Sequence, residues 1–155
     1  IVYKTLHFTT FEFLTCHLVA AASKLVLVAI YRPPSQSITA TFFEELTSLF
    51  ELLSTYNSHI IMAGDFNIHV DDVTNASAQH FLDLLDTFGL LQHVKSATHT
   101  CGHTLDLIIT RPDYCPTYVD VDPPVLSDHG LVTCCFALVR PPPPARRTKV
   151  TRRLN

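Results

Sequence analysis

Residues 59–67 join a short apolar run to two polar side chains that could do chemistry. The run over 59–63 is typical of a strand buried on both faces. Because side chains alternate along a strand, Asp65 and Asn67 should face one side while Phe66 anchors the other. A carboxylate and a carboxamide held side by side can position a water molecule and a phosphate. The same residue types are common in an Asx turn, and this stretch alone does not decide between the two interpretations.

Two further polar positions lie near predicted strands. His129 can bind a phosphoryl oxygen or stabilise developing charge, and the adjacent Asp128 can hold a metal ion. Taken alone, residues 127–130 are typical of a polar turn. Asp106 lies in an apolar strand, where a carboxylate is costly unless it is paired, and His129 is a natural partner for it.

Two weaker candidates are a tyrosine and a group of potential zinc ligands. Tyr31 ends a predicted strand, where its phenol could reach a phosphate, although a single tyrosine is more often a packing residue. His99, Cys101 and His103 alternate, so on an extended segment they would share a face and could bind zinc. A fourth ligand at the usual spacing is missing, which argues against a zinc site.

Charge is distributed unevenly along the chain. Residues 1–139 contain all 14 acidic residues but only five of the 11 basic ones, a net charge of −9. An acidic body binds nucleic acid poorly, so a phosphate ester substrate should need a divalent cation to offset the repulsion. The other basic residues lie in 140–155, which also holds four consecutive prolines. We expect this segment to be a stiff, solvated linker rather than part of the folded domain.

The composition is that of a folded domain without disulfides. The 155 residues are 47% hydrophobic, which fits one globular domain or part of one. Five cysteines form no C-x-x-C pair, and their odd number favours reduced thiols in an intracellular protein. No apolar run reaches membrane-spanning length. Because residue 1 is isoleucine, the chain is expected to begin inside a longer open reading frame.

Strand-like and helix-like segments alternate along the chain. Strands are predicted over residues 11–19 and 25–31, and their short connection suggests an antiparallel pair. After the central strand, Gly64 lets the backbone bend or approach a neighbour closely. Further strands are predicted over residues 90–94, 104–110 and 132–139.

Two amphipathic helices are predicted between these strands. A capping box formed by Thr41 and Glu44 should begin the first helix, which runs to about Tyr56. Asn75 can cap the second helix, which runs through Phe88.

Taken in order, three segments resemble the motifs of the endonuclease/exonuclease/phosphatase superfamily: GDFN at 64–67, TLDLI at 104–108 and SDH at 127–129. Two more segments look like one subgroup, the apurinic-type endonuclease domain of non-LTR (LINE-type) retrotransposons. They are YRPP at 31–34 and ATHT at 97–100.

The resemblance covers roughly residues 10–139 and implies a fold, a reaction and partners. The fold would be a four-layer α/β sandwich (DNase I-like), with this chain supplying the C-terminal half to two-thirds of the domain. The reaction would be hydrolysis of a DNA phosphodiester with Mg²⁺, or Mn²⁺, as cofactor. The nick would leave a 3′-hydroxyl that primes a reverse transcriptase expected downstream in the full-length protein. A functional protein would act in the nucleus, and no membrane partner is expected.

The resemblance also implies roles for individual residues. Asp65 would orient or deprotonate the attacking water, and Asn67 would hold that water or a phosphate oxygen. Asp128 would sit at the metal ion. His129 would bind the phosphate and stabilise transition-state charge.

Two supporting residues and two alternatives complete these expectations. Asp106 would orient His129, and Tyr31 would contact the phosphate.

The family's metal-binding Glu has no counterpart after Ile1, so we expect weak or absent nuclease activity from these residues alone. One alternative is a phosphatase of the same superfamily, although such phosphatases usually carry a Trp-Cys-Asp-Arg-type segment where this chain has TLDL at 104–107. The other is a non-catalytic remnant.

Overall fold

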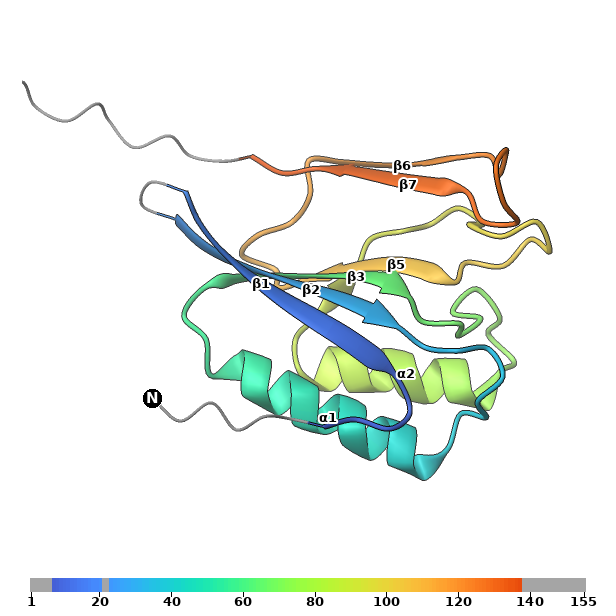
Figure 1. Cartoon of the computed structure of the whole chain (residues 1–155), viewed down its shortest axis with the longest axis horizontal. Helices are drawn as coiled ribbons and strands as arrows, with labels where there is room; N and C mark the ends of the chain where they lie inside the picture. The colour runs from blue at the N-terminus through green and yellow to red at the C-terminus, as the bar shows by residue number, and fades with distance from the viewer. Residues whose placement is uncertain (1–6, 21–22, 138–155) are drawn as a thin grey trace, which may run out of the picture.

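The computed structural model describes residues 7–20 and 23–137, and the linker predicted over 140–155 lies outside them. The main strands are β1 (Glu12–Ala20), β2 (Ser23–Tyr31), β3 (His59–Asp65), β4 (Leu91–Gln92) and β5 (Asp106–Thr110). They form a five-stranded sheet in the order β1-β2-β3-β5-β4 (Figure 1). The predicted antiparallel pairing of β1 with β2 is confirmed.

The register of the sheet places three polar residues in one row. β2 and β3 are parallel, and Tyr31 at the end of β2 pairs with Asp65 at the end of β3. β5 runs the opposite way and begins at this same end of the sheet, where Asp106 pairs with Asp65. Three side chains distant in sequence therefore lie on neighbouring strands at one end of the sheet.

Two helices cover one face of the sheet, and a hairpin lies on the other side (Figure 1). The helices are α1 (Ala40–Ser54) and α2 (Ala76–Thr87), and the hairpin consists of β6 (Tyr118–Asp122) and β7 (Leu131–Cys135). The described residues thus form three layers of the α/β sandwich: helices, sheet and hairpin. Within this part of the chain, neither helix is long and apolar enough to span a membrane.

The core lies between the five-stranded sheet and the two helices. Alternate side chains of β2 and β3 point into it, and one stripe of each helix packs against them. The helical spacing of the α1 aromatics predicts this stripe correctly. Its buried members on α1 are Phe42, Phe43, Leu46, Leu49, Phe50 and Leu53.

The first helix begins earlier than the sequence predicts. Its N-cap is Thr39, whose backbone is extended and whose side chain accepts a hydrogen bond from the backbone N–H of Phe42. Thr41 lies inside the first turn, so it cannot form the predicted capping box with Glu44. The predicted cap of α2 is confirmed, because the Asn75 side chain accepts hydrogen bonds from two backbone N–H groups of the first turn.

Three strands are shorter than predicted, and β6 has no counterpart in the prediction. β4 has only two residues, β5 begins at Asp106 and β7 ends at Cys135 within the described residues. In β6, half-buried valines alternate with exposed polar side chains, and the five-residue strand has no long apolar run to reveal it. It forms because it pairs with β7.

At Gly64 the backbones of β2 and β3 leave no room for a side chain. Gly64 has a φ of +147°, which favours glycine. A Cβ at this position would lie 1.9 Å from the carbonyl oxygen of Ile30. The predicted close approach is therefore confirmed, and it immediately precedes Asp65.

Gly64→Ala should lower the free energy of unfolding by about 3 kcal/mol or more, because the new methyl group would overlap sheet backbone and the residue would be strained. Gly89→Ala is the matched control, since Gly89 has a φ of +61° but no atom within 4 Å of its Cβ position. Its cost should be about 1 to 2 kcal/mol, the ordinary cost of a left-handed residue. Urea denaturation measures both, and equal losses would contradict the steric explanation.

Candidate active site

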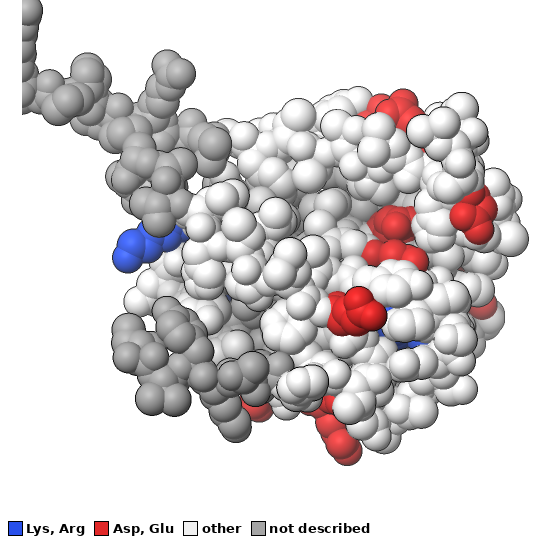
Figure 2. Space-filling model, in the orientation of Figure 1, with Lys and Arg blue, Asp and Glu red and all other residues white. Residues whose placement is uncertain are grey.

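A cleft of about 830 Å³ opens at the end of the sheet where β2 and β3 stop and β5 begins. Figure 2 shows acidic side chains gathered on the right-hand side of this view of the molecule. All the side chains that the sequence predicts for the site line this one cleft. They are Tyr31, Asp65, Asn67, Asp106, Asp128 and His129.

Asp65 and Asn67 form a paired carboxylate and carboxamide. The backbone N–H of Asn67 donates to Asp65 Oδ1 at 3.0 Å, and Asn67 Nδ2 donates to Asp65 Oδ2 at 2.7 Å. The first bond closes an Asx turn, which is one of the two sequence interpretations. Phe66 is buried on the opposite side, as predicted. Asn67 has left the strand, however, and its φ of +50° rather than strand alternation aims its side chain.

The environment of Asp65 favours its protonated form. Burial is the main cause that raises the pKa of Asp65 above its ordinary value, and the negative charge of Asp106 acts in the same direction. The N–H groups of Asn67 oppose this shift without cancelling it. A carboxylate with a raised pKa is a stronger base than an ordinary aspartate.

Asp106 and His129 form a hydrogen-bonded pair across the cleft. His129 Nδ1 lies 2.8 Å from Asp106 Oδ2, and both side chains are mostly buried. This hydrogen bond is the main cause that raises the pKa of His129 above its ordinary value. Since Nδ1 faces the carboxylate, Nε2 is the ring nitrogen left for a ligand. The structure thus supplies the partner that a carboxylate at position 106 needs.

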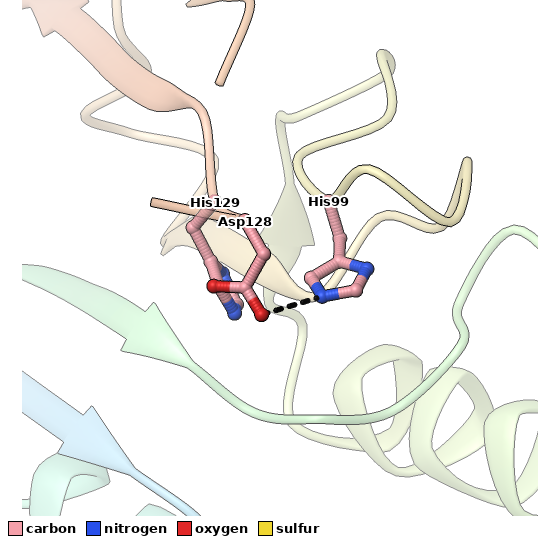
Figure 3. Close-up of side chains that lie close together, drawn as sticks. All are labelled: His99, Asp128 and His129. Atoms are coloured by element: carbon pink, nitrogen blue, oxygen red, sulfur yellow. Dashed lines mark hydrogen bonds and ion pairs between the residues drawn. The ribbon is translucent and has the colours of Figure 1, made fainter. Parts of the chain in front are cut away.

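His99 holds the loop that carries Asp128 and His129 (Figure 3). Its Nε2 lies 3.3 Å from Asp128 Oδ2, while its Nδ1 accepts a hydrogen bond from the backbone N–H of Cys101. Residues 98–100 also run antiparallel to residues 128–130, with two backbone hydrogen bonds between them. The loop is therefore fixed by a bridge rather than by its own sequence.

The zinc ligands considered from the sequence do not converge. His99 faces Asp128, whereas His103 Nδ1 lies 2.9 Å from Asp71 Oδ2. After the bridge at His99 the chain turns, because the backbone N–H of Gly102 donates to the His99 carbonyl. Strand alternation therefore does not place these side chains on one face. Among the described residues, His99, Cys101 and His103 do not form a metal-binding group.

Two other groups of side chains could hold a cation. One consists of Asp65, Asp106 and His129, and the other of His99, Asp128 and His129. In each group, one ligand atom from every residue lies within 4.8 Å of the others. His129 belongs to both groups, so the three carboxylates lie around one imidazole. Asp128 is the most exposed of them, with 67% of its side chain accessible.

Two buried residues that support the site have no signal in the sequence strong enough to predict their roles. The Arg32 side chain donates to the backbone oxygens of Phe66, Asn67 and Gln36. In return, Asn67 Nδ2 donates to the Arg32 carbonyl at 2.8 Å. Thr98 is fully buried, and its hydroxyl accepts from the backbone N–H groups of residues 105 and 106. Arg32 lies in the YRPP segment and Thr98 in the ATHT segment, but the resemblance gave neither residue a role.

The fold and this cleft define a member of the endonuclease/exonuclease/phosphatase superfamily. Residues 25–133 match the family described as endonuclease-reverse transcriptase. The chain therefore belongs to the endonuclease-reverse transcriptase family, as its motifs predict. No curated protein matches the sequence.

Solved structures support the DNase I-like fold. The endonuclease domain of TRAS1, a telomere-specific non-LTR retrotransposon, matches 81% of this chain at a TM-score of 0.67 and 18% identity. A 3′ phosphatase of Neisseria, NExo, bound to a product DNA hairpin, matches 80% at 0.58 and 18% identity. TDP2 of D. rerio with a single-stranded DNA product matches 83% at 0.61 and 15% identity. The chain spans 64%, 65% and 62% of these structures, respectively.

Asp106→Asn should lower the pKa of His129 measured by NMR titration. The wild-type carboxylate stabilises the imidazolium, so the folded-state pKa lies above the unfolded one, and the substitution removes the main cause of that shift. The same pair should stabilise the fold fully below the unfolded-state pKa and lose this effect as the pH rises through the folded-state pKa. An unchanged His129 titration in the variant would contradict the assignment.

Arg32→Lys should lower the free energy of unfolding by about 2 to 3 kcal/mol. The three N–H donors of an ammonium share one nitrogen, so they cannot reach carbonyls that bind the separate nitrogens of the guanidinium. Arg111→Lys is the matched control, since Arg111 also donates to three backbone carbonyls but lies outside the cleft. Both variants should lose stability in urea. Only Arg32→Lys should shift the NMR amide signals of Asp65 and Asn67, and shifts of equal size in both variants would argue against this role.

Proposed function

We propose that this chain is the catalytic part of a metal-dependent endonuclease that cuts a phosphodiester bond of DNA. The observation that carries the proposal is the convergence of Asp65, Asn67, Asp106 and His129 in one cleft of a chain that belongs to the endonuclease-reverse transcriptase family. DNA in the solved structures of NExo and TDP2 supports the choice of substrate.

Asp65 and Asn67 activate the attacking water in this proposal. The backbone nitrogen and the side-chain nitrogen of Asn67 each donate to one carboxylate oxygen of Asp65. The side-chain oxygen of Asn67 is therefore left to orient the water. Asp65 has lone pairs left to accept the proton, and its raised pKa suits a general base. The fixed turn holds both groups in place before the substrate arrives.

In the same proposal, His129 and Tyr31 bind the oxygens of the phosphoryl group that the water attacks. As an imidazolium, His129 donates from Nδ1 to Asp106 and from Nε2 to a phosphoryl oxygen, where negative charge develops in the transition state. Tyr31 pairs with Asp65 in the sheet and is 45% exposed, so its phenol can contact the phosphate.

A divalent cation fits the donor set of this cleft. Mg²⁺ prefers carboxylate oxygens, and Asp65, Asp106 and Asp128 provide them. Burial is the main cause that raises the pKa of Asp65, and the nearby carboxylate of Asp106 adds to the shift. A bound cation would offset this repulsion between the two carboxylates. When bound, the ion neutralises charge on the phosphate and on the departing oxygen. We assign Asp128 to this ion, with Mn²⁺ as an alternative to Mg²⁺.

We expect weak metal binding and slow turnover from this chain. The family resemblance implies a metal-binding Glu, but no Glu is among the described residues that line the cleft, and Asp128 is exposed. The nick would leave a 3′-hydroxyl that could prime a reverse transcriptase, the second activity named in the family's description. The protein would then act in the nucleus, where it meets chromosomal DNA.

In a plasmid assay with Mg²⁺, the chain should convert supercoiled DNA slowly to the nicked form. Asp65→Asn and His129→Gln should each lower the rate at least 100-fold, since general base catalysis and charge stabilisation each supply about that much. Chelation with EDTA should stop the reaction. Nicking that survives Asp65→Asn would contradict the proposed roles.

Two other outcomes of this assay identify the alternatives. Release of inorganic phosphate from a 3′-phosphorylated oligonucleotide without any nicking would point to a phosphatase. A chain that neither cuts DNA nor gains thermal stability when Mg²⁺ is added would be a non-catalytic remnant, because a ligand that binds the folded state must stabilise it.

A further inference from the structure

A second Asp–His pair that is linked through Nδ1, Asp71–His103, lies at the cleft, and the proposed reaction does not use it. His103 Nδ1 lies 2.9 Å from Asp71 Oδ2, and His129 Nδ1 lies 2.8 Å from Asp106 Oδ2. The two pairs use the same atoms, and their imidazoles are similarly exposed, at 34% and 30%. Both imidazoles line the same cleft.

The second pair is held in place by its neighbours. The backbone N–H of Thr104 donates to Asp71 Oδ1 at 2.8 Å. Burial tends to raise the pKa of Asp71, but the hydrogen bonds from Thr104 and His103 outweigh it, so the pKa lies below its ordinary value. The ring of His69 stacks on His103 with 3.9 Å between centroids and 16° between planes. His103 is therefore fixed, with Nε2 left for a ligand.

The charges of the cleft show what this ligand should be. Its described lining residues include three aspartates but no lysine or arginine. A chain of phosphates that enters the cleft can therefore meet positive side-chain charge only at imidazoles. The cleft is also large, at about 830 Å³. A water molecule takes about 30 Å³, and a phosphoryl group has only a few more heavy atoms, so the cleft has room for more than one phosphate.

We propose that the Asp71–His103 pair binds a second phosphate of the polynucleotide, next to the phosphodiester held at His129. This inference rests on the proposed function and specifies its substrate as a chain of several phosphates. As an imidazolium, His103 donates from Nδ1 to Asp71 and from Nε2 to a non-bridging phosphate oxygen. Asp71 offsets the positive charge, which keeps this position compatible with the cation held among the other aspartates.

The test measures binding, so it does not depend on hydrolysis. A labelled single-stranded oligonucleotide with non-hydrolysable phosphorothioate linkages is titrated by fluorescence anisotropy across a range of salt concentrations. The pH is held at about 6, below the ordinary histidine pKa of about 6.5. Each phosphate contact contributes about 0.7 to the slope of log K against log salt for a single strand.

His103→Gln should weaken binding about tenfold to a hundredfold, the effect expected for one hydrogen bond to a charged group, and should reduce the salt slope by about 0.7. His103→Lys should restore the slope, because an ammonium also binds phosphate. The matched control is His80→Gln, since His80 is exposed and stacks on Phe43 away from the cleft. This control should leave both affinity and slope unchanged.

Each result decides between distinct conclusions. An unchanged slope in His103→Gln, or an equal change in His80→Gln, would overturn the second phosphate site. A wild-type chain that nicks the plasmid but does not bind the oligonucleotide would overturn this site alone, and a chain that does neither would overturn both this site and the proposed function. A chain that binds with the His103-dependent slope but cuts no plasmid would retain the phosphate site and refute only the hydrolysis.

Discussion

The site depends on the hydrogen bonds that the buried guanidinium of Arg32 donates to the loop after β3. The guanidinium satisfies the carbonyls of the loop that follows β3, and Asn67 in turn donates to the Arg32 carbonyl. Burial lowers the pKa of Arg32, and the negative charge of Asp65 opposes this shift. The Arg32 guanidinium therefore stabilises this loop in two ways, through its hydrogen bonds and through its attraction to the carboxylate of Asp65. Without it, the left-handed turn at Asn67 would lack support.

The rest of the site is assembled by the sheet and by one loop-to-loop bridge. The register of β3 with its neighbours aligns Tyr31, Asp65 and Asp106. Residues 127–129 belong to another layer, and they reach this row through the bridge to residues 98–100 and the bond between His129 and Asp106. The same stretch holds the start of β5, because the Thr98 hydroxyl accepts from the backbone N–H groups there. One buried threonine thus ties both halves of the cleft together.

The parts of the molecule that follow from local chemistry could be predicted from the sequence. Apolar runs mark β2 and β3, helical spacing marks the buried stripe of α1, and Asn75 marks the start of α2. The close approach at Gly64 also follows from local chemistry, because glycine permits a backbone conformation that other residues forbid. That Asp106 needs a partner follows in the same way, since a buried carboxylate in a strand is costly unless it is paired.

What could not be predicted depends on contacts between distant segments. β6 has no apolar signal of its own and exists through β7. The roles of Arg32 and of the Asp71–His103 pair arise from residues more than 30 positions apart. A shared face for His99, Cys101 and His103 required an extended backbone, and the turn over residues 99–102 separates these side chains. Sequence patterns predict the periodicity of an element, but they do not predict contacts between side chains that are distant in sequence.

The parallel pairing of β2 with β3 also has a consequence for how the chain folds. β1 and β2 are adjacent in sequence and can form a hairpin early, whereas β3 can join β2 only after the intervening α1 has crossed the sheet. Asp65 meets Asp106 only when β5 docks later still. We therefore expect the two aspartates to remain apart until β5 docks. Their mutual repulsion should then raise the free energy only of the last, cooperative step of folding.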